Sequence, residues 1–251
     1  GVDIAVGSRA GLCLCDIEVV RSGTTDVREA FGRVRLEVTD AASGERMPAR
    51  VGLYDSTGRM PLPSEAAVMV HRFTDEVRRL WVSPRAFWPV EHRQAFYVNG
   101  SYEALVPTGT YELVVTRGLE YRTYHGQVEI RSNETRTVSI ALERYINQPD
   151  RGWYSGDAHI HIQRDKTQDE NAWAQLAAED VHVGNLLQMG NIAATHFGQP
   201  AWGAAGRFER DGHALVSGQE DPRTVHRGHT IHHNLQQPLH VGPEGYFLYH
   251  E

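Results

Sequence analysis

The chain has 251 residues, of which 40% are hydrophobic and 9% aromatic, and its formal net charge is −7. That apolar content is enough for one large core or two ordinary ones, which excludes a disordered chain. Acidic and basic residues are interspersed along the sequence, so we expect no nucleic acid among its partners. No apolar run approaches the roughly 18 residues that a membrane span requires, so no membrane span is expected.

Residues 1–31 form an N-terminal segment that contains both cysteines, Cys13 and Cys15. Two residues of a strand at this spacing face the same way and are poorly placed to bridge each other. Because no other cysteine exists to complete a thiolate site, we interpret them as structural thiols. The chain begins without Met, as a trimmed product would, and we favour an extracytoplasmic location, periplasmic or secreted.

Residues 32–147 alternate β-branched or aromatic runs with turn signals, which predicts an antiparallel β-sandwich of immunoglobulin or transthyretin type. The runs at 32–40 and 49–58 are expected to pair with each other. Hairpin turns are expected at 99–100, where Asn-Gly occurs, at 107–109, and around 132–134. An aromatic and proline-containing insertion at 74–94 is expected either to shelter one edge of the sandwich or to face a second domain.

The pattern changes near residues 148–152, where a second domain, 152–251, is expected to begin. A strand, an acidic-started helix and another strand follow one another, which predicts a βαβ unit. Two further strand candidates then predict the opening of a parallel α/β domain. These elements are expected at 156–162, 167–180, 181–189, 213–220 and 228–235.

Histidines are concentrated in this second half. Of 14 in the chain, three precede residue 150 (His71, His92 and His125), which leaves 11 after it. An H-x-H pair alone is weak evidence, because at this density chance supplies about one per hundred residues. The alternation of the strand is more specific, since it places Asp157, His159 and His161 on one face and small or branched residues on the other. Two imidazoles on such a face are costly to bury unpaired, and a divalent metal would satisfy both.

Two further side chains are candidates for the same site. Glu220 ends an otherwise apolar face of the strand at 213–220 and could bridge metals. His229 stands at the beginning of the run at 228–235 and is a plausible ligand. His232 and His233 are adjacent, so they cannot both face the same way and at least one is expected to lie outside the site.

The motifs "GWYSGDAHIHI", "SGQE" and "GHTIHHNL" follow one another in an order that resembles the CehA/McbA-like branch of the PHP-type metallohydrolases. The preceding β module resembles a carboxypeptidase-regulatory-like, transthyretin-related domain. The resemblance implies an α+β multidomain fold, in which an N-terminal antiparallel β-sandwich is followed by the first part of a PHP-type (β/α) barrel. The later motifs of that family have no counterpart before Glu251, so the barrel and its activity are expected to be incomplete in this chain.

The resemblance also implies roles for individual residues. His159 and His161 match the first-motif ligands, Glu220 matches a carboxylate that bridges two metals, and His229 matches a ligand of the second metal. Asp157 matches an aspartate that orients a ligand. One or two Zn²⁺ or Mn²⁺ ions would then activate water for hydrolysis of an ester, amide, carbamate or phosphoester bond in a small-molecule or glycan-like substrate.

Two other interpretations stay open. The sandwich could be a carbohydrate- or surface-binding module joined to a non-catalytic, degenerate PHP-like segment, and five aromatics would then serve binding: Trp81, Phe87, Trp88, Phe96 and Tyr97. A cupin-like metal site around "GHTIHHN" is disfavoured by the expected helix at 169–180. Neither the substrate nor the oligomeric state can be derived from the sequence.

Overall fold

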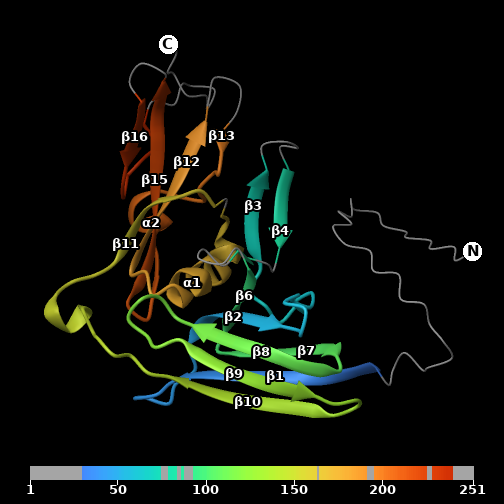
Figure 1. Cartoon of the computed structure of the whole chain (residues 1–251). Coiled ribbons are helices and arrows are strands. Elements are labelled where there is room, and N and C mark those ends of the chain that lie inside the picture. The colour runs from blue at the N-terminus through green and yellow to red at the C-terminus, as the bar shows by residue number, and fades with distance from the viewer. Residues whose placement is uncertain are drawn as a thin grey trace, which may run out of the picture.

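A computed structural model of the chain describes residues 30–74, 79–83, 86–87, 93–162, 164–190, 195–224 and 228–239. Figure 1 shows a β-sandwich in the lower half of the view, a mixed sheet in the upper half, and helix α1 between them. Several residues named above lie outside the described residues, namely Cys13, Cys15, Trp88 and His92.

The sandwich consists of a three-stranded sheet in the order β10-β1-β7 and a five-stranded sheet in the order β5-β6-β2-β8-β9. A two-stranded ribbon of β3 and β4 accompanies them. The strands are β1 (Phe31–Asp40), β2 (Pro48–Tyr54), β3 (Val70–Thr74), β4 (Arg79–Ser83), β5 (Ala86–Phe87), β6 (Gln94–Asn99), β7 (Ser101–Pro107), β8 (Gly109–Thr116), β9 (Tyr124–Ile130) and β10 (Thr135–Leu142).

Alternation along the strands builds the core of the sandwich, as the sequence predicted. On β1 the side chains of Val34, Leu36 and Val38 are completely buried, while the residues between them reach the surface. They join one cluster with residues of the facing sheet, such as Val51 and Leu113. The β-sandwich character of this half is therefore confirmed. It is not purely antiparallel as predicted, because β1 and β10 pair in parallel.

The predicted strand connections are wrong. β1 pairs with β7 and β10, whereas β2 pairs with β6 and β8, so the two strands lie in different sheets. The turns at 99–100, 107–109 and 131–134 also lead from one sheet to the other and close no hairpin. Each connected strand has one apolar face, and a crossover between sheets lets both faces enter the same core. Turn residues satisfy the backbone equally well in a hairpin and in such a corner.

The second half contains a six-stranded sheet with the path β11-β12-β15-β14, to which β13 and β16 add by pairing with β12 and β15. β11, β12 and β15 are parallel, so the predicted strand-helix-strand unit is present. β13, β14 and β16 run antiparallel to their partners. The elements are β11 (Gly156–Ile160), β12 (Val183–Gly190), β13 (Thr195–His196), β14 (Phe208–Arg210), β15 (His213–Thr224), β16 (Gly228–His232), α1 (Asp169–Ala178), α2 (Gly203–Gly206), and the short 3₁₀ helices η2 (Pro149–Arg151) and η3 (Lys166–Gln168).

The predicted fold class, an α+β protein with a PHP-type (β/α) barrel, is wrong. Barrel closure of that type needs a helix after each parallel strand. In the described part of the chain, β12 and β15 are instead followed by the antiparallel strands β13 and β16, and the sheet stays open. Only α1, with ten residues, is longer than one turn of α-helix there.

Helix α1 connects the two halves by packing against both. It begins with acidic residues, which suit a helix N-terminus, and its buried residues Trp173 and Leu176 join one cluster with Leu186 and Leu215 of the sheet. The same cluster includes Tyr97 of the sandwich.

Beside α1, partly buried polar groups join the halves. The Tyr97 hydroxyl donates to Glu179 at 2.7 Å, and Arg50 forms an ion pair with the same carboxylate at 3.0 Å. Asp180 accepts a hydrogen bond from Arg144 at 2.8 Å. Gly118 fits closely against this corner, because a β-carbon there would stand 2.4 Å from that of Asp180.

Candidate metal centre

Three elements of the mixed sheet bring the predicted ligands together. The parallel order β11-β12-β15 places the C-terminal ends of these strands at one edge, where His159, His161 and Glu220 lie. The antiparallel return of β16 then sets His229 opposite Arg223, close to Glu220 along β15. Strand order therefore brings two histidines of one stretch to a glutamate that follows His159 by 61 residues and to the histidine of the next strand.

Candidate ligand atoms of His159, His161 and Glu220 all lie within 4.8 Å of one another. The Nε2 atoms of the two histidines are 2.9 Å apart, and they lie 3.2 and 2.6 Å, respectively, from Oε2 of Glu220. Nδ1 of His229 contacts the other carboxylate oxygen, Oε1. Glu220 thus stands at the centre, with each of its oxygens directed to different imidazoles.

The tautomer of His161 follows from its other ring nitrogen. Nδ1 lies 3.0 Å from the backbone carbonyl of Leu187, which can only accept, so Nδ1 carries the proton. In the neutral ring, Nε2 then presents a lone pair to Glu220 Oε2, which is also an acceptor. Two lone pairs at 2.6 Å repel unless the contact contains a proton, on His161 or on the carboxyl group, or both atoms bind the same metal ion.

The burial of Glu220 strengthens the need for a compensating positive charge. The side chain of Glu220 is 2% exposed, whereas those of His159 and His229 are 49% and 54% exposed. A buried carboxylate is costly without a compensating cation. The carboxylate therefore forms the floor of the site, and the imidazoles form a rim open to solvent.

The spacing of the ligand atoms fits a small ion. Ligands about 2.0–2.1 Å from a tetrahedral Zn²⁺ lie about 3.3 Å from one another. The separations of 2.9 and 3.2 Å are close to this value, and the 2.6 Å contact between His161 and Glu220 is shorter. Imidazole and carboxylate are also ligand types that Zn²⁺ and Mn²⁺ accept. The residues present thus fit a divalent metal.

Asp157 lies beside the centre and does not point a carboxylate into it. Its Oδ1 accepts the backbone N–H of His159 at 2.9 Å, an arrangement that fixes the strand leading to the ligand. The pairing of β11 with β12 shifts register between Asp157 and Ile160, so the regular alternation predicted for this strand is interrupted. The rings of His159 and His161 still lie together, with centroids 4.8 Å apart.

Other histidines make structural contacts away from this site. His232 Nε2 lies 2.9 Å from the backbone carbonyl of Asp221. His182 and His213 stack with ring centroids 5.0 Å apart at the junction of the two halves, and Arg117 approaches Nε2 of His213 at 3.2 Å. Burial lowers the pKa of His213, and the nearby Arg117 charge acts in the same direction.

Two neighbours of the centre were not predicted from the sequence, the Leu187 carbonyl and the ring of Phe197. The Phe197 ring lies 4.8 Å from that of His161, centroid to centroid. It reaches this place because β13 folds back on β12. The Gly190-Asn191 pair at the end of β12 is a turn signal that could have predicted that return.

No protein-family model matches the chain, and no curated protein matches it. Similar solved structures include a pilus 2b backbone protein of group B streptococcus, 13% identical over 47% of this chain and 43% of that chain, with a TM-score of 0.29. A streptococcal ancillary pilin is 17% identical over 48% of this chain and 34% of that chain, with a TM-score of 0.29. A DUF3823 family protein from Parabacteroides merdae is 13% identical over 46% and 47%, with a TM-score of 0.22.

In each case the chain spans less than half of the matched protein, and similarity at this level supports no inference about function. The predicted membership of the CehA/McbA-like branch of the PHP superfamily is wrong: no family model supports it, and the described residues form β-sheets without a barrel. No helix of the described residues is long and apolar enough to cross a membrane. An extracytoplasmic location stays a prediction.

Proposed function

We propose that this chain binds a divalent metal ion, Zn²⁺ or Mn²⁺, through His159, His161, Glu220 and His229. The observation that carries the proposal is the convergence of candidate ligand atoms from His159, His161 and the buried Glu220, which all lie within 4.8 Å of one another. The carbonyl of Leu187 faces Nδ1 of His161, which leaves Nε2 directed to the carboxylate and available to a metal ion.

The proposed site accommodates one ion or two. Oε2 of Glu220 faces His159 and His161, while Oε1 faces His229. A single ion would be held by the first group, and a second ion would share the carboxylate and take His229. The open rim leaves room for water or a small ligand beside the imidazoles.

Such an ion would supply Lewis acidity and a water of lowered pKa, which is the chemistry of hydrolysis of esters, amides or phosphoesters. The residues would contribute orientation: Glu220 holds the imidazoles in place, and Asp157 fixes the backbone of His159. Hydrolysis of a small-molecule or glycan-like substrate is therefore the catalytic extension of this proposal.

Metal binding is tested directly by titrating chelator-treated protein with Zn²⁺ and Mn²⁺ in a calorimeter and by elemental analysis after dialysis. The His161→Ala and Glu220→Gln variants are expected to lose the ion. His125→Ala is the matched control, because His125 is an exposed histidine of β9 in the sandwich. Equal binding by the control and both site variants would refute the proposed ligands.

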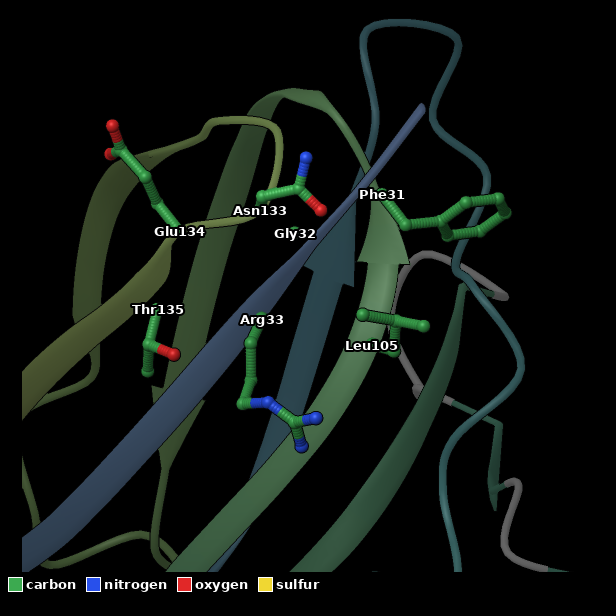
Figure 2. Close-up of a pocket in the computed structure, with 7 residues that line it drawn as sticks. All are labelled: Phe31, Gly32, Arg33, Leu105, Asn133, Glu134 and Thr135. Carbon is green, nitrogen blue, oxygen red and sulfur yellow. The ribbon is translucent and has the colours of Figure 1, made fainter. Parts of the chain in front are cut away.

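A second candidate is the carbohydrate- or surface-binding sandwich. Among the aromatics proposed for that role, Phe96 and Tyr97 are buried at 1% and 6% exposure, so they cannot stack on a glycan. A groove of about 500 Å³ at one end of β1 offers another place. Figure 2 shows Phe31 and Leu105 on one side of β1 and Glu134 and Thr135 on the other.

This groove combines an aromatic ring and an aliphatic side chain with charged and hydroxyl groups, a mixture suited to a short glycan. Leu105 is 61% exposed, so its apolar surface is available. Titrating the full chain with soluble oligosaccharides, and repeating the titration with Leu105→Asp, tests this candidate. Binding that the substitution does not weaken would exclude the groove.

A further inference from the structure

Phe197 has a backbone conformation that is unusual for a large side chain. Its φ angle is 54°, in the left-handed region that glycine and asparagine tolerate and bulky residues rarely adopt. The residue is nevertheless 7% exposed, so its ring is packed inside the protein. Strained conformations of this kind persist only where the surroundings hold them, and they are concentrated at functional sites.

Gln199 provides much of that restraint. Its Nε2 donates to the carbonyl of Phe197 at 2.9 Å and to the carbonyl of Ile162 at 3.2 Å. Its backbone N–H donates to the side chain of Gln188 at 3.4 Å. The strained residue is thereby tied both to the end of β12 and to the residue that directly follows His161.

The result of this strain is a ring contact with a proposed metal ligand. The Phe197 and His161 rings are 4.8 Å apart, with 31° between their planes. The carbonyl of Leu187 holds His161 at Nδ1 and so fixes where Nε2 points. A hydrogen bond through one atom leaves the imidazole free to rock about that bond, and the face of Phe197 limits this motion.

We propose that Phe197 is a positioning residue for the metal centre: it fixes the plane of the His161 imidazole so that its Nε2 lone pair meets the ion. This inference rests on the proposed metal binding by His161 and Glu220. A residue that only filled space would not need a strained backbone. Here the left-handed conformation brings the ring over His161.

The test uses Co²⁺ as a spectroscopic substitute for Zn²⁺ in the full chain. Phe197→Gly removes the ring and relaxes the backbone, while Phe197→Leu keeps much of the apolar volume without the flat face. We expect a 10- to 100-fold loss of Co²⁺ affinity in Phe197→Gly, the range typical of residues that orient ligands, and a smaller loss in Phe197→Leu. The visible absorption bands of bound Co²⁺ should shift in both.

Trp173→Leu is the matched control, because Trp173 is a buried aromatic of α1 at 2% exposure that belongs to the cluster between the two halves. It should lower thermal stability while leaving the Co²⁺ affinity and spectrum unchanged. Wild-type affinity and spectrum in both Phe197 variants would overturn this inference alone. Wild-type protein that binds neither Co²⁺ nor Zn²⁺ would overturn the proposed metal site together with it.

Discussion

If the proposed metal site is correct, substituting Glu220 by glutamine should remove most of the stabilisation that the bound ion would give to this protein. A ligand that binds only the native state at 100 times its dissociation constant stabilises it by about 2.7 kcal/mol. Glu220 is the one buried, charged member of the cluster and contacts all three imidazoles. If its loss weakens binding about 100-fold, the same metal concentration equals the new dissociation constant, and the stabilisation falls to about 0.4 kcal/mol.

Differential scanning calorimetry measures this directly. For a chain of about 250 residues, 1 kcal/mol corresponds to about 2–4 °C in Tm, so Zn²⁺ should raise the wild-type Tm by about 5–11 °C and that of Glu220→Gln by about 1–2 °C. His125→Ala should respond like the wild type, because His125 lies in the sandwich. An equal rise in Glu220→Gln would refute the reasoning that this carboxylate holds the ion.

Three further predictions concern the frame of the protein. Tyr97→Phe should lower the free energy of unfolding, measured by urea denaturation, by about 1.5–3 kcal/mol, because its hydroxyl donates to the charged Glu179 at the junction; an unchanged value would contradict that role. Gly118→Ala should lower it by more than about 1 kcal/mol, since φ is +48° and the new β-carbon would meet Asp180; a stabilised variant would contradict the close fit. Burial lowers the pKa of His213 below 6.5, so as the pH falls the unfolded chain binds a proton at this histidine before the folded protein does. The free energy of unfolding should therefore be full above about pH 6.5 and decrease as the pH drops below it. His213→Gln should reduce this pH dependence, and an unchanged dependence would show that His213 is not its source.

Sequence alternation predicted the strands of the sandwich far better than their partners. The apolar side chains of β1 and β2 are buried as expected, yet the two strands lie in different sheets. Gly100 shows why: its φ of +76° is required by the reversal between β6 and β7, and glycine permits that reversal whether the next strand pairs with the previous one or crosses to the other sheet. Partner choice depends on which faces meet across the core, and local sequence does not contain that information.

The second half shows the opposite case, in which a wrong fold class still brought the predicted ligands together. A barrel and an open sheet share the parallel order β11-β12-β15, so either would place Glu220 of β15 near His161, which directly follows β11. Predicting that Glu220 and His161 lie close together therefore required only the order of the strands.

The prediction of His229 required even less information. It lies near the beginning of β16, and a short connection from the end of β15 returns the chain beside Glu220. What strand order could not predict is the ring that packs on His161, because Phe197 directly follows β13, which pairs with β12. The carbonyl of Leu187, by contrast, lies on β12, the strand next to β11. Candidate metal ligands can thus be identified from local sequence, while their orientation depends on tertiary contacts. This is why a substitution at Phe197 is the sharper test of the proposed centre.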